Sequence, residues 1–234
     1  MSQSSPTQLS LPVYLPDDET FTSFYAAANC ELIDQLQSIA QGKGDNNVFL
    51  WGEPKCGRTH LLHAACAAAN EAQRRSFYLP LAIHSSLSVA VFEDLEQCDL
   101  VCLDDIHSIC GNPLWEEAVF DLYNRVAEQG HTLIVSGNAG PASLPIALPD
   151  LRSRLSWGVA YQLHPLDDEQ KLAALTRRAE ARGLSLPEDA GRFLLNRLNR
   201  DMRTLFDVLD KLDKASMVHQ RRLTIPFIKE TLLL

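Results

Sequence analysis

An apolar, strand-like run at Asn47–Trp51 leads directly into the octapeptide Gly52-Glu53-Pro54-Lys55-Cys56-Gly57-Arg58-Thr59, and a helical pattern begins immediately behind it. The two glycines let the backbone turn with its N–H groups pointing inward, and the N-terminus of the following helix favours an anion at the same point. The segment therefore predicts a strand, a phosphate-binding loop and a helix, in that order. A glycine turn that binds nothing is the alternative.

Arg58 stands where the phosphate-loop pattern has lysine. A guanidinium can bind phosphate oxygens through two donors, but it cannot act as a compact point charge between two phosphates. We therefore expect phosphate binding to be retained and hydrolysis to be weak. The hydroxyl of Thr59 would be a ligand for Mg²⁺.

A second strand-like run, Leu100–Leu103, ends in the two carboxylates Asp104 and Asp105. In open α/β folds, ligands bind at the carboxyl ends of the strands, so Asp104 is expected near the Mg²⁺ that Thr59 would hold. Asp105 would orient a water molecule. The alternative for this pair is a helix cap or a turn.

Strand and helix patterns alternate through the first two thirds of the chain, which predicts an α/β domain with a parallel sheet covered by helices on both faces. The predicted strands are Asn47–Trp51, Ser76–Leu81, Leu100–Asp104, His131–Ser136 and Val159–Leu163, and the predicted helices are 31–41, 59–73, 87–96 and 113–129. After Pro165 only helices are predicted, at 167–182, 187–199, 201–219 and 226–233. We therefore expect a flexible arm at 1–19, an α/β domain at 20–165 and a small all-helical lid at 166–234.

Charge is distributed unevenly along the 234 residues. Residues 1–165 hold 8 Lys/Arg against 19 Asp/Glu, whereas residues 166–234 hold 13 against 11. The acidic part argues against direct DNA binding, which requires a basic face.

No apolar run approaches the length of a membrane span, and the N-terminus lacks the basic and apolar segments of a secretory signal. Since such a signal is lacking, we expect the six cysteines to be reduced thiols in the cytoplasm, and since they form no C-x-x-C pair, we expect no zinc site.

Three further segments complete a resemblance to the AAA+ ATPases, and within them to the replication initiator DnaA. They are Leu133–Asn138, Leu148–Gly158 and Arg200–Leu205, and the resemblance spans about 20–233. It implies that Asn138 is a polar sensor of the terminal phosphate, that Arg154 is an arginine finger acting on a neighbouring subunit's nucleotide, and that Arg203 is the lid's sensor. The nucleotide-binding residues that it implies are Gly52, Pro54, Cys56, Gly57, Arg58, Thr59, His60, Asp104, Asp105, Asn138 and Arg203. Each arginine also has an ordinary alternative, a surface ion pair for Arg154 and an exposed helical position for Arg203.

Two departures from DnaA refine the expected function. The chain ends with the lid, so the DNA-binding domain of the initiator is not expected, and neither is a role in origin recognition. The N-terminal arm contains Gln8-Leu9-Ser10-Leu11-Pro12, which resembles the peptide that docks on the sliding clamp, the beta subunit of DNA polymerase III. Leu9 and Leu11 would be apolar anchors and Gln8 a directional amide, and Pro12 would keep the peptide extended.

Together these resemblances imply a negative regulator of replication initiation. Tethered to the clamp on DNA, with ADP or another nucleoside diphosphate and Mg²⁺ as its ligands, it would stimulate ATP hydrolysis by DnaA in trans through Arg154. Its own ATPase would be weak or absent, and a homodimer would be its storage form. The alternatives are a DnaA-like adaptor or loader without this activity, a self-sufficient ATPase of the helicase-loader type, and a protein whose nucleotide is merely structural.

Overall fold

The computed structural model describes residue 16 and the ranges 19–199 and 201–234. Its centre is a five-stranded parallel sheet in the order β2-β3-β4-β1-β5. The strands are β1 (Asn47–Gly52), β2 (Ser76–Pro80), β3 (Leu100–Asp104), β4 (Thr132–Gly137) and β5 (Val159–Leu163). In this register Leu103 pairs with Val135, which in turn pairs with Phe49. The carboxyl ends of β3, β4 and β1 therefore lie side by side at one edge of the sheet.

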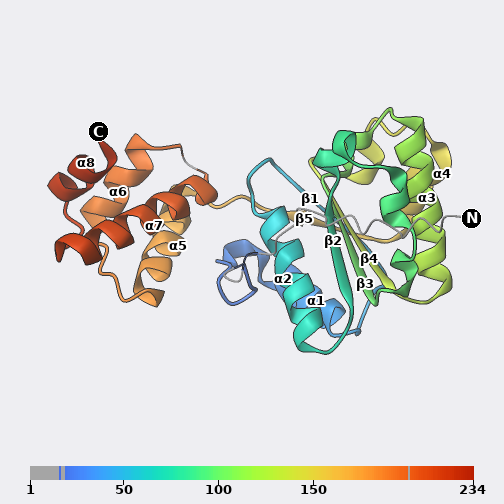
Figure 1. Ribbon diagram of the computed structural model, residues 1–234, viewed down its shortest axis with the longest axis horizontal. Helices are drawn as coiled ribbons and strands as arrows, with labels where there is room; N and C mark the ends of the chain where they lie inside the picture. Colours follow the sequence, from blue (N-terminus) through green and yellow to red (C-terminus); the bar gives the residue numbers. More distant parts are fainter. Residues whose placement is uncertain (1–15, 17–18, 200) are drawn as a thin grey trace, which may run out of the picture.

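Helices cover both faces of the sheet, as the alternating pattern predicted (Figure 1). On one face α1 (Cys30–Ala40) and α2 (Arg58–Glu71) share a core that includes the fully buried Leu36, Leu50 and Leu61. On the other face α3 (Pro113–Glu128) and α4 (Pro149–Trp157) pack around Phe49 and Leu122. The fold class predicted from the sequence is confirmed.

The prediction of a helix at 87–96 is wrong. The chain instead forms three successive 3₁₀ segments, η2 (Leu81–Ser86) before this range, η3 (Val89–Phe92) inside it and η4 (Leu95–Gln97) at its end. Ser88 caps the second of them, and Asp94 has a positive φ of 61°, which a continuous right-handed helix does not allow. The nine-residue α4 was not expected; it begins with Pro149 at its first position, where a missing N–H costs nothing.

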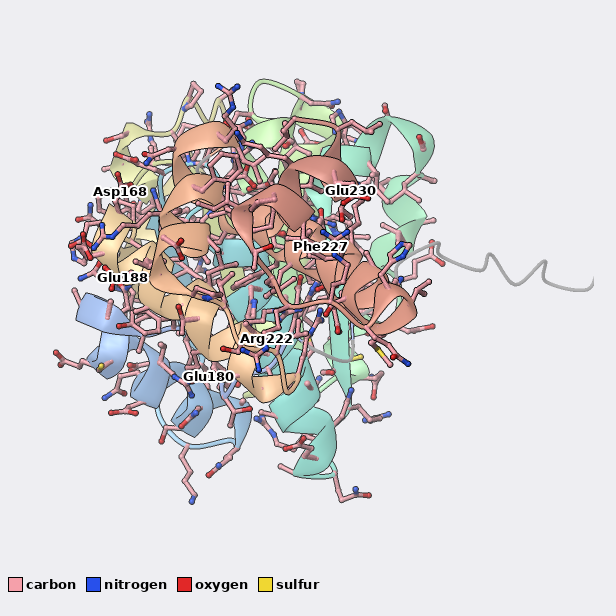
Figure 2. All side chains as sticks on the ribbon, turned by 90° about the vertical axis from the view of Figure 1, so that its left-hand side faces the viewer. Asp168, Glu180, Glu188, Arg222, Phe227 and Glu230 are labelled. Carbon is pink, nitrogen blue, oxygen red and sulfur yellow. The ribbon has the colours of Figure 1, made fainter. Side chains whose placement is uncertain are left out.

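Residues after β5 form the helical lid, built from α5 (Asp168–Ala181), α6 (Glu188–Arg197), α7 (Met202–His219) and α8 (Ile225–Leu232). Their apolar faces enclose a separate core that contains Leu175, Leu194, Leu209 and Phe227. Figure 2 looks at this end of the molecule and shows the exposed charged side chains around that core. The helical lid is thus confirmed, while the domain limits at 19/20 and 165/166 stay a prediction.

A buried carboxylate fixes the approach to α4. Glu116 on α3 is 1% exposed, and its Oε1 accepts hydrogen bonds from the backbone N–H of Gly111 at 2.7 Å and of Ala147 at 3.1 Å. Its Oε2 accepts one from the N–H of Leu148 at 2.7 Å, immediately before α4 begins. One side chain therefore satisfies three backbone donors in two loops.

Within the part of the chain that the structure describes, no helix is long and apolar enough to cross a membrane.

We predict that Glu116→Ala lowers the free energy of unfolding by about 3 kcal/mol, because it leaves three backbone donors without their acceptor. Urea denaturation measures this loss. The neighbouring Glu117 is exposed, so Glu117→Ala is a matched control and should change stability by less than about 0.5 kcal/mol. Equal effects of the two variants would contradict the role of Glu116.

Candidate functional site

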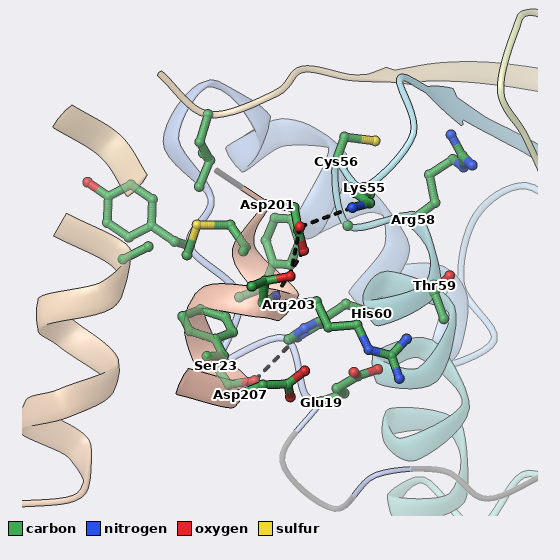
Figure 3. A pocket seen from close by; sticks show the side chains of 18 of the residues that line it. Glu19, Ser23, Lys55, Cys56, Arg58, Thr59, His60, Asp201, Arg203 and Asp207 are labelled. Carbon is green, nitrogen blue, oxygen red and sulfur yellow. Dashed lines mark hydrogen bonds and ion pairs between the residues drawn. The ribbon is translucent and has the colours of Figure 1, made fainter. Parts of the chain in front are cut away.

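A cleft of about 720 Å³ lies between the octapeptide loop, the segment before α1, and the lid helices α5 and α7 (Figure 3). The residues of the loop and the start of α2 that line it are Pro54, Lys55, Cys56, Gly57, Arg58, Thr59 and His60. The lid contributes Arg178 from α5 and Asp201, Arg203 and Phe206 from the start of α7. Segments far apart in the sequence therefore enclose one space.

Both glycines of the loop occupy positions that no other residue could take without strain. Gly57 has a φ of 109° and directly precedes α2, and a Cβ there would lie 2.7 Å from the ring of Phe24. A Cβ on Gly52 would lie 2.6 Å from the carbonyl oxygen of Leu163. No side chain caps the first turn of α2, so its backbone N–H groups are available to an anion in the cleft.

Arg58 is 8% exposed and joins the loop to the end of β3. One of its terminal nitrogens donates to the carbonyl oxygens of Gly52 and, at 3.1 Å, of Glu53. The other donates to Asp105 Oδ1 at 2.8 Å and forms an ion pair with it. Arg58 thus lines the cleft while its guanidinium holds the loop closed against Asp105, and a contact between Arg58 and phosphate stays a prediction.

Asp104 lies behind Thr59 and is 2% exposed. Its Oδ2 accepts hydrogen bonds from Thr59 Oγ1 at 2.7 Å and from the Tyr78 hydroxyl at 2.8 Å, and its Oδ1 accepts one from Ser136. Burial and the neighbouring Asp104 carboxylate raise the pKa of Tyr78, which keeps the phenol as a donor. Three hydroxyls from α2, β2 and β4 therefore converge on one carboxylate.

Tyr78 and Ser136 were not predicted as site residues. Ser136 follows the apolar run Leu133–Val135 and is 0% exposed, and its Oγ also accepts the backbone N–H of Asp105 at 2.8 Å. A hydroxyl that directly follows an apolar run was the available signal. Tyr78 gave no comparable signal, because its contact with Asp104 depends on the pairing of β2 with β3.

The contacts of Tyr78 continue to the segment before α1. Its ring meets that of His63 edge-on, with 4.3 Å between centroids, and His63 Nδ1 lies 2.5 Å from Glu19 Oε2. The hydrogen bond with His63 lowers the pKa of Glu19, and the charge of Arg203 contributes in the same direction. Glu19, at the edge of the cleft, is thus connected through two buried rings to Asp104.

His60 closes the cleft on the same side. Its Nε2 donates to the carbonyl oxygen of Thr20 at 2.9 Å, and its ring meets that of Phe24 edge-on at 5.2 Å. Burial lowers the pKa of His60, so the neutral imidazole is the favoured form. Phe24 in turn lies against Gly57, which places an aromatic wall beside the loop.

Among the described residues, an ion pair across the cleft ties the lid to the loop. Lys55 Nζ lies 3.0 Å from Asp201 Oδ2, as the dashed line in Figure 3 marks. Asp201 also caps α7, because it accepts hydrogen bonds from the backbone N–H of Thr204 at 2.9 Å and from its hydroxyl at 2.8 Å. Burial would raise the pKa of Asp201, but these hydrogen bonds and Lys55 leave it lowered. Arg203 follows in the first turn of α7 and is exposed to the cleft.

Four predicted residues within the described part of the chain do not belong to the cleft lining: Gly52, Asp104, Asn138 and Arg154. Asn138 is exposed, one residue beyond the end of β4, and does not belong to the cleft lining. Arg154 lies on α4, across the sheet from α2 and at the end of the molecule away from the lid (Figure 1). Gln8–Pro12, the predicted clamp-binding peptide, lies outside the described residues.

Comparison with known protein families defines the relationship of this chain. The family model for the bacterial DnaA ATPase domain matches residues 15–162, which is more than half of the sequence. The chain belongs to the bacterial DnaA family. A second family model, described as the lid domain of Hda, matches residues 168–232, so this is an Hda-like member of the DnaA-related AAA+ proteins.

Solved DnaA structures share the fold. AMPPCP-bound DnaA from Aquifex aeolicus is 20% identical with a TM-score of 0.71, over 85% of this chain and 66% of that one. Domain III of DnaA from Thermotoga maritima is also 20% identical, with a TM-score of 0.77 over 94% of this chain and 98% of that one. A single-residue variant of RuvB from Thermotoga maritima is 16% identical with a TM-score of 0.64, over 91% of this chain and 72% of that one. The chain thus spans just under two thirds of the Aquifex DnaA and almost all of the isolated domain III.

The lowered pKa values of His60 and Glu19 predict that stability falls with acidification. Below pH 6.5 the unfolded chain binds a proton at His60 more readily than the folded protein does, and below pH 4.5 the same holds for Glu19. Since the unfolded state binds more protons, the free energy of unfolding decreases as the pH falls. The thermal midpoint should therefore be lower at about pH 5 than at pH 7.

Replacement of His60 by Gln should flatten the midpoint curve between about pH 5 and 7. His164 is exposed, so His164→Gln is the matched control and should leave the shape of the curve as in the parent protein. A slope that persists in the His60 variant would mean that other groups cause the acid sensitivity.

Proposed function

We propose that this protein binds a nucleoside diphosphate in its cleft and stimulates ATP hydrolysis by DnaA in trans, as a negative regulator of replication initiation. The observation that carries the proposal is the separation of two features. The phosphate loop faces the cleft, whereas Arg154 lies on α4 across the sheet. An arginine in that place is out of reach of its own cleft, but it can reach a nucleotide held by a neighbouring AAA+ protein.

Several features support nucleotide binding. The N–H groups at the start of α2 and the side chains of Lys55 and Arg203 provide donors and positive charge for phosphates. The aromatic wall of Phe24 and His60, with Phe206 from the lid, provides surfaces for a base. Aquifex DnaA, which shares this fold, is AMPPCP-bound. We assign ADP as the ligand because the contacts of Arg58 disfavour turnover.

The contacts of Arg58 engage two groups that hydrolysis would need, the Arg58 guanidinium itself and the Asp105 carboxylate. The guanidinium of Arg58 is held by the loop carbonyls and by Asp105. Asp105, which would orient a water molecule, is therefore already paired with a cation. A loop fixed in this way can retain a diphosphate, but it lacks a mobile lysine-like charge for a transferred phosphoryl group. The protein would then activate another ATPase and have little ATPase activity of its own.

Thr59 and Asp104 fit a magnesium ion that accompanies the nucleotide. Both offer hard oxygen ligands, and the three hydrogen bonds to Asp104 leave one of about four acceptor positions on its carboxylate. When bound, the ion would neutralise phosphate charge. Thr59 would hold it, and Asp104 would orient the Thr59 hydroxyl.

Arg154 is suited to act outside its own chain. Among the described residues its side chain has aromatic neighbours but neither a hydrogen-bond partner nor an ion-pair partner. Its N–H donors are therefore free for a phosphate of DnaA-bound ATP. An arginine finger stabilises the charge of phosphoryl transfer and contributes about 10³–10⁵ to the rate.

The N-terminal arm would determine where the protein stimulates ATP hydrolysis by DnaA. We propose that Gln8–Pro12 docks on the sliding clamp as an extended peptide, and that a homodimer stores the protein in the cytoplasm between encounters. Clamp tethering raises the local concentration of the regulator on replicated DNA. Regulation would then follow replication without direct DNA binding by this chain.

Replacing Arg58 by Ala tests the nucleotide site. We expect ADP affinity to fall at least about tenfold, because the variant loses a buried cation and the contacts that hold the loop. Titration calorimetry with ADP measures this, and Arg75→Ala, at an exposed arginine away from the cleft, is the matched control. Unchanged affinity would mean that Arg58 supports neither the phosphate nor the loop conformation that binds it.

Replacing Arg154 by Ala tests the trans activity. Phosphate release from ATP-loaded DnaA is measured with the ADP-bound protein and the sliding clamp on DNA. We expect stimulation by the parent protein and a loss of at least about 100-fold in the variant, with ADP and clamp binding retained. Arg152→Ala, an exposed neighbour on α4, is the control and should retain most of the activity.

Two outcomes of this assay would contradict the proposal. Undiminished stimulation by Arg154→Ala would refute the role of that residue. Absence of stimulation by the parent protein, despite clamp binding, would leave a clamp-tethered adaptor or loader of the DnaA family. In the same assay, a Gln8→Ala/Leu9→Ala variant should lose the clamp dependence and keep ADP binding; loss of both would contradict a separate docking arm.

A further inference from the structure

Two aromatic rings from different helices flank the guanidinium of Arg154. Its Cζ lies 5.8 Å from the ring centroid of Tyr123 on α3 and 5.5 Å from that of Trp157 on α4. Both distances are within the range in which a ring face attracts a cation. Arg154 and Trp157 are three residues apart, so they share one side of the helix.

The two rings differ in their surroundings. Tyr123 is 4% exposed and belongs to the core between α3, α4 and the sheet, so its ring is a fixed surface. Trp157 is 78% exposed at the last position of α4. Packing inside this chain therefore does not explain the presence of a large indole at that position, whereas its contact with Arg154 does.

The backbone holds Trp157 in place even though its side chain is exposed. A Cβ on the next residue, Gly158, would lie 2.3 Å from the carbonyl oxygen of Asn47, so the chain passes directly against the start of β1. At its other end α4 is held by the hydrogen bond from the N–H of Leu148 to Glu116. The helix backbone is thus held at both ends, which fixes the positions from which the side chains of Trp157 and Arg154 extend.

Ring faces restrain a guanidinium without using its donors. A carboxylate partner would engage the N–H groups of Arg154 and would have to be displaced before they could reach a phosphate. Stacking contacts leave all five donors at the edge of the plane. Contacts with two aromatic rings therefore restrict the rotamers of the arginine and keep it ready for an anion outside the chain.

We propose that Tyr123 and Trp157 are positioning residues for Arg154, which they hold in the direction from which it enters the nucleotide site of a partner. The inference rests on the proposed function and extends it to residues that touch neither nucleotide nor partner phosphate. Trp157 is the residue to test, since its exposure allows truncation without loss of a core side chain.

The experiment compares Trp157→Ala, Trp157→Phe and Arg154→Ala in the assay of clamp-dependent phosphate release from ATP-loaded DnaA, over a range of concentrations of this protein. For Trp157→Ala we expect the maximal rate at saturation to fall about tenfold, because the arginine samples more rotamers, while the half-saturating concentration changes less than about twofold. Trp157→Phe retains a ring face and should restore the maximal rate to within about threefold of the parent.

Met217 on the lid supplies a matched control, because it is a large apolar side chain of similar exposure, 74%, far from Arg154. Met217→Ala should change neither parameter. The thermal midpoint of Trp157→Ala should stay within about 2 °C of the parent, which separates positioning from folding. Trp157→Ala combined with Arg154→Ala should be no less active than Arg154→Ala alone, since the ring acts only through the arginine.

Three results would overturn the inference while leaving the proposed function intact. They are a normal maximal rate in Trp157→Ala, an effect confined to the half-saturating concentration, and a Phe variant as defective as the Ala variant. In contrast, full activity of Arg154→Ala or absence of stimulation by the parent protein would overturn the proposed function itself.

Discussion

The carboxylate of Asp104 is the point around which the α/β part of the molecule is organised. It is buried, and a buried charge is strongly unfavourable unless hydrogen bonds replace its hydration. Thr59, Tyr78 and Ser136 supply these hydrogen bonds from three separate elements. A shift of β2 or β4 by a single residue would turn its hydroxyl to the opposite face of the sheet and remove one of the three hydrogen bonds to the charge. The strand order and the position of the phosphate loop are therefore tied to this one group.

Arg58 extends this organisation from Asp104 to its neighbour. It connects the first residues of the loop with Asp105, so the loop and the end of β3 are held together by a charged hydrogen bond and by carbonyl contacts. A lysine has no planar fork and could not engage both sides in this way. Arg58, which stands where the usual pattern has lysine, thus strengthens the structure of the loop beside Asp105, the carboxylate that would orient a water molecule for hydrolysis.

The local pattern was sufficient to predict the parts of the fold that depend on near neighbours. The strand, loop and helix around Gly52–Thr59, the parallel sheet and the helical lid follow from periodicity and from the glycine positions. The region 87–96 was mispredicted because its apolar spacing suited a helix, while Asp94 takes a left-handed conformation that no short-range pattern indicated. Helix α4 was not predicted because it is short and because the residue before it is held by Glu116, which lies on another helix.

Only those residues of the candidate site that belong to local sequence motifs could be predicted. Gly57, Arg58, Thr59 and Asp104 could be named from motifs. The partners of those residues could not, because Tyr78, Ser136 and Glu19 reach the site through strand pairing and helix packing. The direction of the Arg58 side chain was equally hidden, since it depends on where β3 ends relative to the loop.

The ion pair that Lys55 and Asp201 form across the cleft is weaker than the packing inside each of its walls. Lys55, in the ion pair with Asp201, has a side chain that is 60% exposed, and an exposed pair of this kind contributes about 1 kcal/mol or less. The lid, in contrast, has a core of its own, and so do both faces of the sheet. Phosphates bound at the loop would compete with Asp201 for Lys55 and, beside it, would attract Arg203 on the same helix turn. A ligand in the cleft would therefore change how the lid is held without disturbing any of these three cores, and the cations on the two sides are the groups through which it would do so.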